Sequence, residues 1–171
     1  GCTWQVLPYD KQLEFKQKQV EDQLTRIGHL TLPAISPIIG SESVQEYRNK
    51  LEYTFSDKRW IMDDEPDALS DKELLALGFH VPGMFSKVLD IRSCHLQPEP
   101  SNAIRLFVKR YALEHDLQFF DLYNHVGFLR NLIIRTTSTG EIMVILVVVT
   151  QESGGTLSQA EIVDTKRVLD A

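Results

Sequence analysis

The chain has 171 residues, of which 43% are hydrophobic and 25% are charged, so we expect a packed core and exclude global disorder. The net charge of −6 argues against a surface that binds nucleic acid everywhere, although a local basic face is compatible with it. No apolar run reaches the roughly 18 residues of a membrane-spanning helix, so we expect no membrane partner. Two cysteines do not make a disulfide framework, so we expect a cytoplasmic protein.

The first predicted element is a helix over residues 10–27. Asp10 can cap its start and Gly28 can end it. Apolar side chains recur along one stripe of this helix, at Leu13, Val20, Leu24 and Ile27. Residues 31–40 contain prolines and predict an extended linker, so we expect residues 1–30 to be separate from a domain over residues 31–171.

A half-buried strand is predicted over residues 47–55, where polar and apolar side chains alternate. An acidic insertion follows over residues 56–77, with a short helix after Ser70. Residues 78–81 and 87–92 predict two further strands around a turn that contains Pro82 and Gly83.

A second helix is predicted over residues 101–115. Its core-facing side chains are expected to be Ile104, Phe107, Val108, Tyr111 and Ala112. Residues 129–136 and 142–149 predict a β-hairpin. The second of these strands is apolar throughout, which predicts a central strand covered on both faces. A last helix is expected to start at Ser158, where Glu161 completes a capping box. The fold class is α+β, a mixed and largely antiparallel sheet with flanking helices.

Few residues carry an obvious chemical signature. On spacing alone, Cys2 and Cys94 fit inert thiols better than metal ligands, because no paired cysteines or metal-binding histidine pattern accompany them. Cations near aromatic or imidazole rings are what recognition of single-stranded RNA requires. The candidates are Arg48, Lys50, Phe79, His80 and Lys87. The pattern alone favours ordinary exposed charges and core aromatics at these positions.

Four segments nevertheless resemble RNA (uracil-5-)-methyltransferases, in that family's order. Residues 1–5 (GCTWQ) resemble the end of a C-G-G-C-x-x-Q segment, and residues 47–50 (YRNK) resemble a Y-R-[NR]-[KR] strand. Residues 78–97 are similar to G-F-[HR]…[IV]-x-D-[IV]…C-x-[IL]-Q. Residues 129–143 are similar to the hairpin L-R-x-L-x-[IV]-R…T-G-E-[VI]-M. Together the segments are more specific than any one of them.

The resemblance implies roles for particular residues. In cluster-containing members four cysteines hold an iron–sulfur cluster; Cys2 matches the third and Cys94 the fourth, and the first two would precede Gly1. Arg48 and Lys50 match the RNA-facing strand. The S-adenosylmethionine-binding catalytic domain of the family, with its glycine-rich loop, catalytic cysteine and general-base glutamate, has no counterpart in this chain.

We therefore expect a central RNA-facing segment of an S-adenosylmethionine-dependent enzyme that modifies ribosomal RNA. The segment would position RNA and supply cluster ligands but would not be catalytic alone. The helix over residues 10–27 resembles an element that packs on the absent catalytic domain, so we expect it to be exposed or to pair with another copy. The alternatives are a stand-alone RNA-binding module and a protein-interaction module that uses the acidic insertion.

Overall fold

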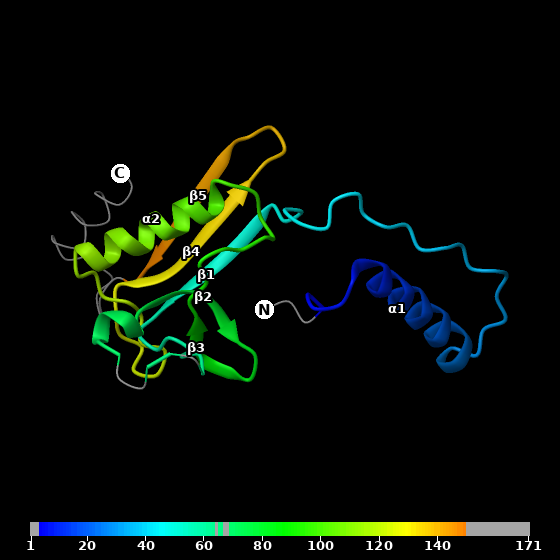
Figure 1. Cartoon of the computed structure of the whole chain (residues 1–171), viewed down its shortest axis with the longest axis horizontal. Coiled ribbons are helices and arrows are strands. Elements are labelled where there is room, and N and C mark those ends of the chain that lie inside the picture. The colour runs from blue at the N-terminus through cyan, green and yellow to red at the C-terminus, as the bar shows by residue number, and fades with distance from the viewer. Residues whose placement is uncertain (1–3, 64, 67–68, 150–171) are drawn as a thin grey trace. The chain divides into compact units, whose positions relative to one another are not determined.

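The computed structural model describes residues 4–63, 65–66 and 69–149. The chain divides into two compact units, Gly1–Val44 and Gln45–Ala171, which are described separately. Figure 1 shows one long helix in the first unit and a sheet with a covering helix in the second. The predicted helix from Ser158 lies outside the described residues.

The first unit contains α1 (Tyr9–Asp22), which continues into a π-helical turn, η1 (Gln23–Ile27). This confirms the predicted helix, but Asp10 does not cap it, because Pro8 occupies the cap position and no side chain bonds to the free N–H groups there. The chain after the helix has no regular structure up to Val44. It returns along the helix, since the Ser41 N–H donates to the Tyr9 hydroxyl at 2.7 Å. No side chain of α1 or η1 is buried.

The second unit is built on a five-stranded sheet in the order β3-β2-β1-β4-β5, and every neighbouring pair of strands is antiparallel. The predicted α+β class is confirmed. The strands are β1 (Lys50–Ser56), β2 (Ala76–Val81), β3 (Met84–Leu89), β4 (Leu129–Thr136) and β5 (Ile142–Val148). The short helix η2 (Asp71–Leu74) begins with a capping box, in which the side chains of Ser70 and Glu73 bond to the first turn. The helix α2 spans Ser101–Glu114.

The core lies between α2 and one face of the sheet (Figure 1). Strand β1 turns Leu51, Tyr53 and Phe55 toward α2, and all three are buried, because successive side chains of a strand point to opposite faces. From α2 come Val108 and Ala112, which are buried as predicted. Ile104, Phe107 and Tyr111 pack against the same cluster but are only partly buried.

Strand β5 is not covered on both faces, so that prediction is wrong. It pairs only with β4 and forms an edge of the described sheet. Ile142, Met143, Val144 and Ile145 are exposed. A continuous apolar run suits burial on both faces, but its composition alone does not fix the strand's place in the sheet.

Glycines set two features of the β2–β3 region. A Cβ on Gly78 would lie 1.9 Å from the carbonyl oxygen of Leu89, so only glycine permits this approach of two backbones. Gly83 has a φ of +79°, a left-handed conformation in the tight turn before β3. The turn closes early enough for β3 to begin at Met84 and not at residue 87.

Candidate nucleic-acid interface

The side of the sheet opposite α2 carries a line of polar side chains, which we call the polar sheet face. Alternation along β1 and β4 turns these side chains away from the core. The pairing of β1 with β4 sets Lys50 beside Arg135, Glu52 beside Ile133, and Thr54 beside Asn131. His80 of β2 joins the same face through a hydrogen bond to Thr54. The polar sheet face comprises Lys50, Glu52, Thr54, His80, Asn131 and Arg135, and the apolar Ile133 lies among them.

One end of the polar sheet face holds two cations side by side. Lys50 and Arg135 are directly opposite one another on neighbouring strands, and both are exposed. Like charges in this position destabilise a sheet. Glu52 offers Lys50 a loose ion pair at 3.7 Å, whereas Arg135 has no ion pair among the described residues. An anion placed between the two cations would relieve their repulsion.

The middle of the polar sheet face holds three linked polar side chains, Thr54, His80 and Asn131. The Thr54 hydroxyl lies 3.1 Å from His80 Nε2, and the Asn131 amide donates to the same hydroxyl at 3.4 Å. Thr54 is only 7% exposed, His80 is exposed and Asn131 is half-buried. The trio therefore presents imidazole and amide groups outward, held in place by a buried hydroxyl.

The other predicted RNA-binding residues lie elsewhere in the second unit. Arg48 is exposed just before β1, and its backbone N–H donates to the Leu96 carbonyl at 2.8 Å. Phe79 lies on the core side, with its ring 5.1 Å from that of Tyr53. Lys87 lies within β3 and is half-buried. The structure thus brings Lys50 and His80 to one face and adds Thr54, Asn131 and Arg135, whose juxtaposition depends on strand register.

Cys94 is 8% exposed and lies in the segment between β3 and α2. The Asn102 side chain holds its backbone, accepting from the Cys94 N–H at 2.8 Å and donating to the Cys94 carbonyl at 3.1 Å. Cys2 lies outside the described residues. Among the residues that the structure describes, no group of three or more His, Cys, Asp or Glu side chains could hold a metal ion.

A buried guanidinium fixes the start of the same segment. Arg105 is 0% exposed and donates to the carbonyls of Ile91 and Arg92. Its guanidinium also lies 5.4 Å from the centre of the Tyr53 ring. Burial first, and then the nearby Cys94, raise the pKa of the Tyr53 phenol to about 12, although the positive Arg105 acts in the opposite direction.

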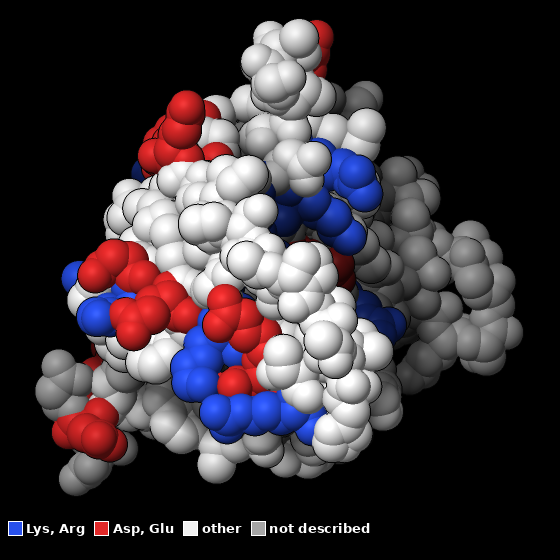
Figure 2. Space-filling view, turned by 90° about the vertical axis from the view of Figure 1, so that its right-hand side faces the viewer, with Lys and Arg blue, Asp and Glu red and all other residues white. Residues whose placement is uncertain are grey.

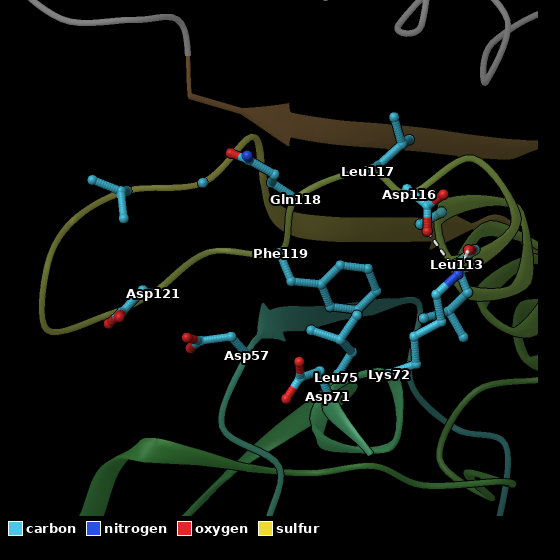
Figure 3. A pocket seen from close by; sticks show the side chains of 13 residues that line it. Asp57, Asp71, Lys72, Leu75, Leu113, Asp116, Leu117, Gln118, Phe119 and Asp121 are labelled. Carbon is cyan, nitrogen blue, oxygen red and sulfur yellow. Dashed lines mark hydrogen bonds and ion pairs between the residues drawn. The ribbon is translucent and has the colours of Figure 1, made fainter.

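An open cavity of about 440 Å³ lies at the C-terminal end of α2 (Figure 3). Apolar side chains such as Leu75, Leu117 and Phe119 line it, together with four aspartates, Asp57, Asp71, Asp116 and Asp121. The Lys58 ammonium and nearby N–H groups hold the pKa of Asp121 well below its usual range. Carboxylates repel phosphates, so this cavity is unsuited to a nucleic-acid backbone.

The chain carries charges of both signs, with 18 Lys and Arg residues and 24 Asp and Glu residues. In Figure 2, basic and acidic side chains of the described residues lie interspersed on the face in view. Electrostatic attraction of RNA would therefore have to come from local groups such as Lys50 and Arg135. In a separate respect, no described helix is both long and apolar enough to cross a lipid bilayer.

Comparison with known proteins relates this chain to proteins named RNA methyltransferases. The chain is 58% identical over 149 residues to a Bacteroides thetaiotaomicron protein named "Uncharacterized RNA methyltransferase", covering 86% of this chain and 33% of that protein. A Porphyromonas gingivalis protein of the same name is 50% identical over 153 residues, with the same coverage. The chain spans about a third of the length of these curated relatives. No family model matches it. The chain is homologous to one segment of proteins named RNA methyltransferases.

A solved structure relates the chain to a more specific class of RNA methyltransferase. The crystal structure of Pyrococcus abyssi tRNA (uracil-54, C5)-methyltransferase, in complex with S-adenosyl-L-homocysteine, matches with a TM-score of 0.61 at 26% sequence identity. The match covers 90% of this chain and 32% of that one. The resemblance to RNA uracil-5-methyltransferases noted in the sequence is thus confirmed for this segment.

Proposed function

We propose that this chain is the RNA-holding segment of an S-adenosylmethionine-dependent RNA uracil-5-methyltransferase of the cytoplasm. The observation that carries the proposal is the exposed pair Lys50 and Arg135, whose like charges are set side by side by strand register. Such a pair destabilises the sheet. Glu52 pairs only loosely with Lys50, and the phosphates of RNA would supply further anions. The names of the relatives and of the structural neighbour support the same activity.

In this proposal the present chain positions the RNA, and another domain carries out methyl transfer. Contacts of Lys50, Arg135 and Arg48 with phosphates would fix the position of the RNA without reading its sequence. S-adenosylmethionine, bound by a domain outside this sequence, would supply the methyl group. That domain would also carry the thiolate that adds to uracil and the base that removes its C5 proton. The present chain alone is then expected to transfer no methyl group.

The salt dependence of RNA binding tests the proposal. For single strands, each phosphate that the protein neutralises adds roughly 0.7 to the slope of log affinity against log salt. Lys50→Ala and Arg135→Ala are each expected to reduce the slope by about that amount, measured by fluorescence anisotropy with a labelled single-stranded RNA. Arg110→Ala is the matched control, because Arg110 is an exposed cation on α2. Equal slopes for all four proteins would contradict the proposal.

We further propose that the RNA is ribosomal and that Cys94 and Cys2 ligate an iron–sulfur cluster. The fixed backbone of Cys94 suits a ligand, but two thiolates are fewer than the four that such a cluster takes. The ligand set would therefore be completed by cysteines outside this sequence. Iron and sulfide analysis of the longer protein, purified anaerobically with and without Cys94→Ser, tests this. Unchanged iron content in the variant would contradict it.

The exposed helix α1 supports one more proposal, that the isolated chain self-associates through residues 10–27. No side chain of α1 is buried in its unit, and the exposed fractions of Phe15 and Val20 are 49% and 48%. Sedimentation velocity should show concentration-dependent association that Phe15→Lys and Val20→Lys together abolish. A parent chain that sediments as a monomer at every concentration would contradict the proposal.

A further inference from the structure

The trio of Thr54, His80 and Asn131 has unused hydrogen-bonding capacity that faces outward. The Thr54 hydroxyl accepts from the Asn131 amide, so its own hydrogen is free to point to His80 Nε2, 3.1 Å away. A neutral His80 that accepts at Nε2 carries its hydrogen on Nδ1. His80 Nδ1 and the Asn131 side-chain carbonyl oxygen then have no partner among the described residues. In this tautomer His80 Nδ1 is a donor, and the Asn131 side-chain carbonyl oxygen is an acceptor.

We propose that this trio reads the edge of an unpaired RNA base, with His80 and Asn131 contacting the base and Thr54 positioning both. The proposal rests on the RNA-binding function proposed above and assigns base recognition to a different part of the same face. A donor beside an acceptor matches a base edge, whereas a phosphate offers only acceptors. The Thr54 hydroxyl and the Asn131 amide carry no charge, so they add little attraction for phosphate, which Lys50 and Arg135 supply elsewhere.

The surroundings of the trio also suit a base. Ile133 lies two residues from Asn131 on the same strand face, and Ile145 of β5 is directly opposite Ile133. Ile133 is half-buried and Ile145 is 38% exposed, so they offer an apolar surface to a flat ring. Thr54 is four residues from Lys50 along β1, or about 13 Å at the rise of a strand. One nucleotide segment can therefore place a phosphate near Lys50 and a base over the trio.

Abasic RNA separates base recognition from backbone binding. Two labelled oligonucleotides would be compared by anisotropy at one salt concentration: oligouridine, and the same ribose–phosphate chain with the bases removed. The parent chain should bind oligouridine more tightly. Asn131→Ala and His80→Ala should each lower that preference roughly three- to tenfold, which is the loss of one or two ordinary hydrogen bonds. Binding of the abasic chain should not change.

Two variants make the test specific. Thr54→Val keeps the shape of the buried side chain but removes the hydroxyl that orients His80 and Asn131. It should therefore lower the preference for oligouridine, although Thr54 itself does not contact the RNA. Lys50→Ala should weaken both oligonucleotides equally. If the parent chain binds both oligonucleotides with equal affinity, or if Asn131→Ala leaves the preference unchanged, the inference is overturned while backbone binding stands. If neither oligonucleotide binds, the proposed function fails together with the inference.

Discussion

Replacing Arg105 with Met tests how the segment that carries Cys94 is held. The guanidinium is 0% exposed and donates to two main-chain carbonyls, those of Ile91 and Arg92. Each charge-assisted hydrogen bond is worth roughly 1.5–3 kcal/mol, and both carbonyls would lose their donor. Removal of a buried charge offsets part of this loss, because its desolvation cost also disappears. We expect a net destabilisation of about 2–4 kcal/mol.

Urea unfolding measures this change. The chain has two tryptophans, so a Trp4→Phe background leaves Trp60 as the only reporter, and Trp60 lies in the second unit. Arg110→Met is the control; Arg110 lies on the same helix but is exposed, and its loss should cost less than about 0.5 kcal/mol. Hydrogen exchange at the Cys94 amide should accelerate in Arg105→Met. A free energy of unfolding within about 0.5 kcal/mol of the parent's would refute the reasoning.

Four other substitutions test three separate features. Tyr53→Phe removes a buried hydroxyl that has no hydrogen-bond partner. Relative to this variant, the parent should lose about 2–3 kcal/mol of its free energy of unfolding, measured in urea, as pH rises from 10 toward 12. The reason is that the folded state keeps the phenol protonated. Gly78→Ala should cost more than about 3 kcal/mol through its clash with Leu89, whereas Gly83→Ala, in open space, should cost about 1 kcal/mol. Asp121 has a lowered pKa, so it stabilises the fold above its unfolded pKa and less as pH falls; Asp121→Asn should weaken this acid dependence of thermal unfolding.

Local sequence patterns predicted the elements of the second unit well but not their neighbours. The hairpin of β4 and β5 and the helix α2 were visible in alternation and periodicity. The edge position of β5 was not, because an apolar run carries no information on strand order. Arg105 was also missed as a core residue, since its burial depends on carbonyls of a segment 13 or 14 residues away.

The candidate site was only partly accessible from sequence for the same reason. Lys50 and His80 could be proposed from their residue types, near aromatic neighbours. Their relation to Arg135, Thr54 and Asn131 depends on the β1–β4 register and on one hydrogen bond across β1 and β2. The sequence of one strand does not determine which residue of a neighbouring strand will lie opposite it. The like-charged pair and the polar trio can therefore be identified only in the folded sheet.

Methylation of RNA by the longer protein tests the central claim most directly. The chain together with the sequence encoded on either side of it would be incubated with labelled S-adenosylmethionine and unmodified ribosomal RNA, beside the 171-residue chain and a longer protein carrying Lys50→Ala and Arg135→Ala. We expect label at uridine C5 from the longer parent alone at low RNA concentration, with the double variant recovering activity as RNA is raised. A longer protein that binds RNA but labels no uridine, or a double variant as active as the parent at every RNA concentration, would contradict the account.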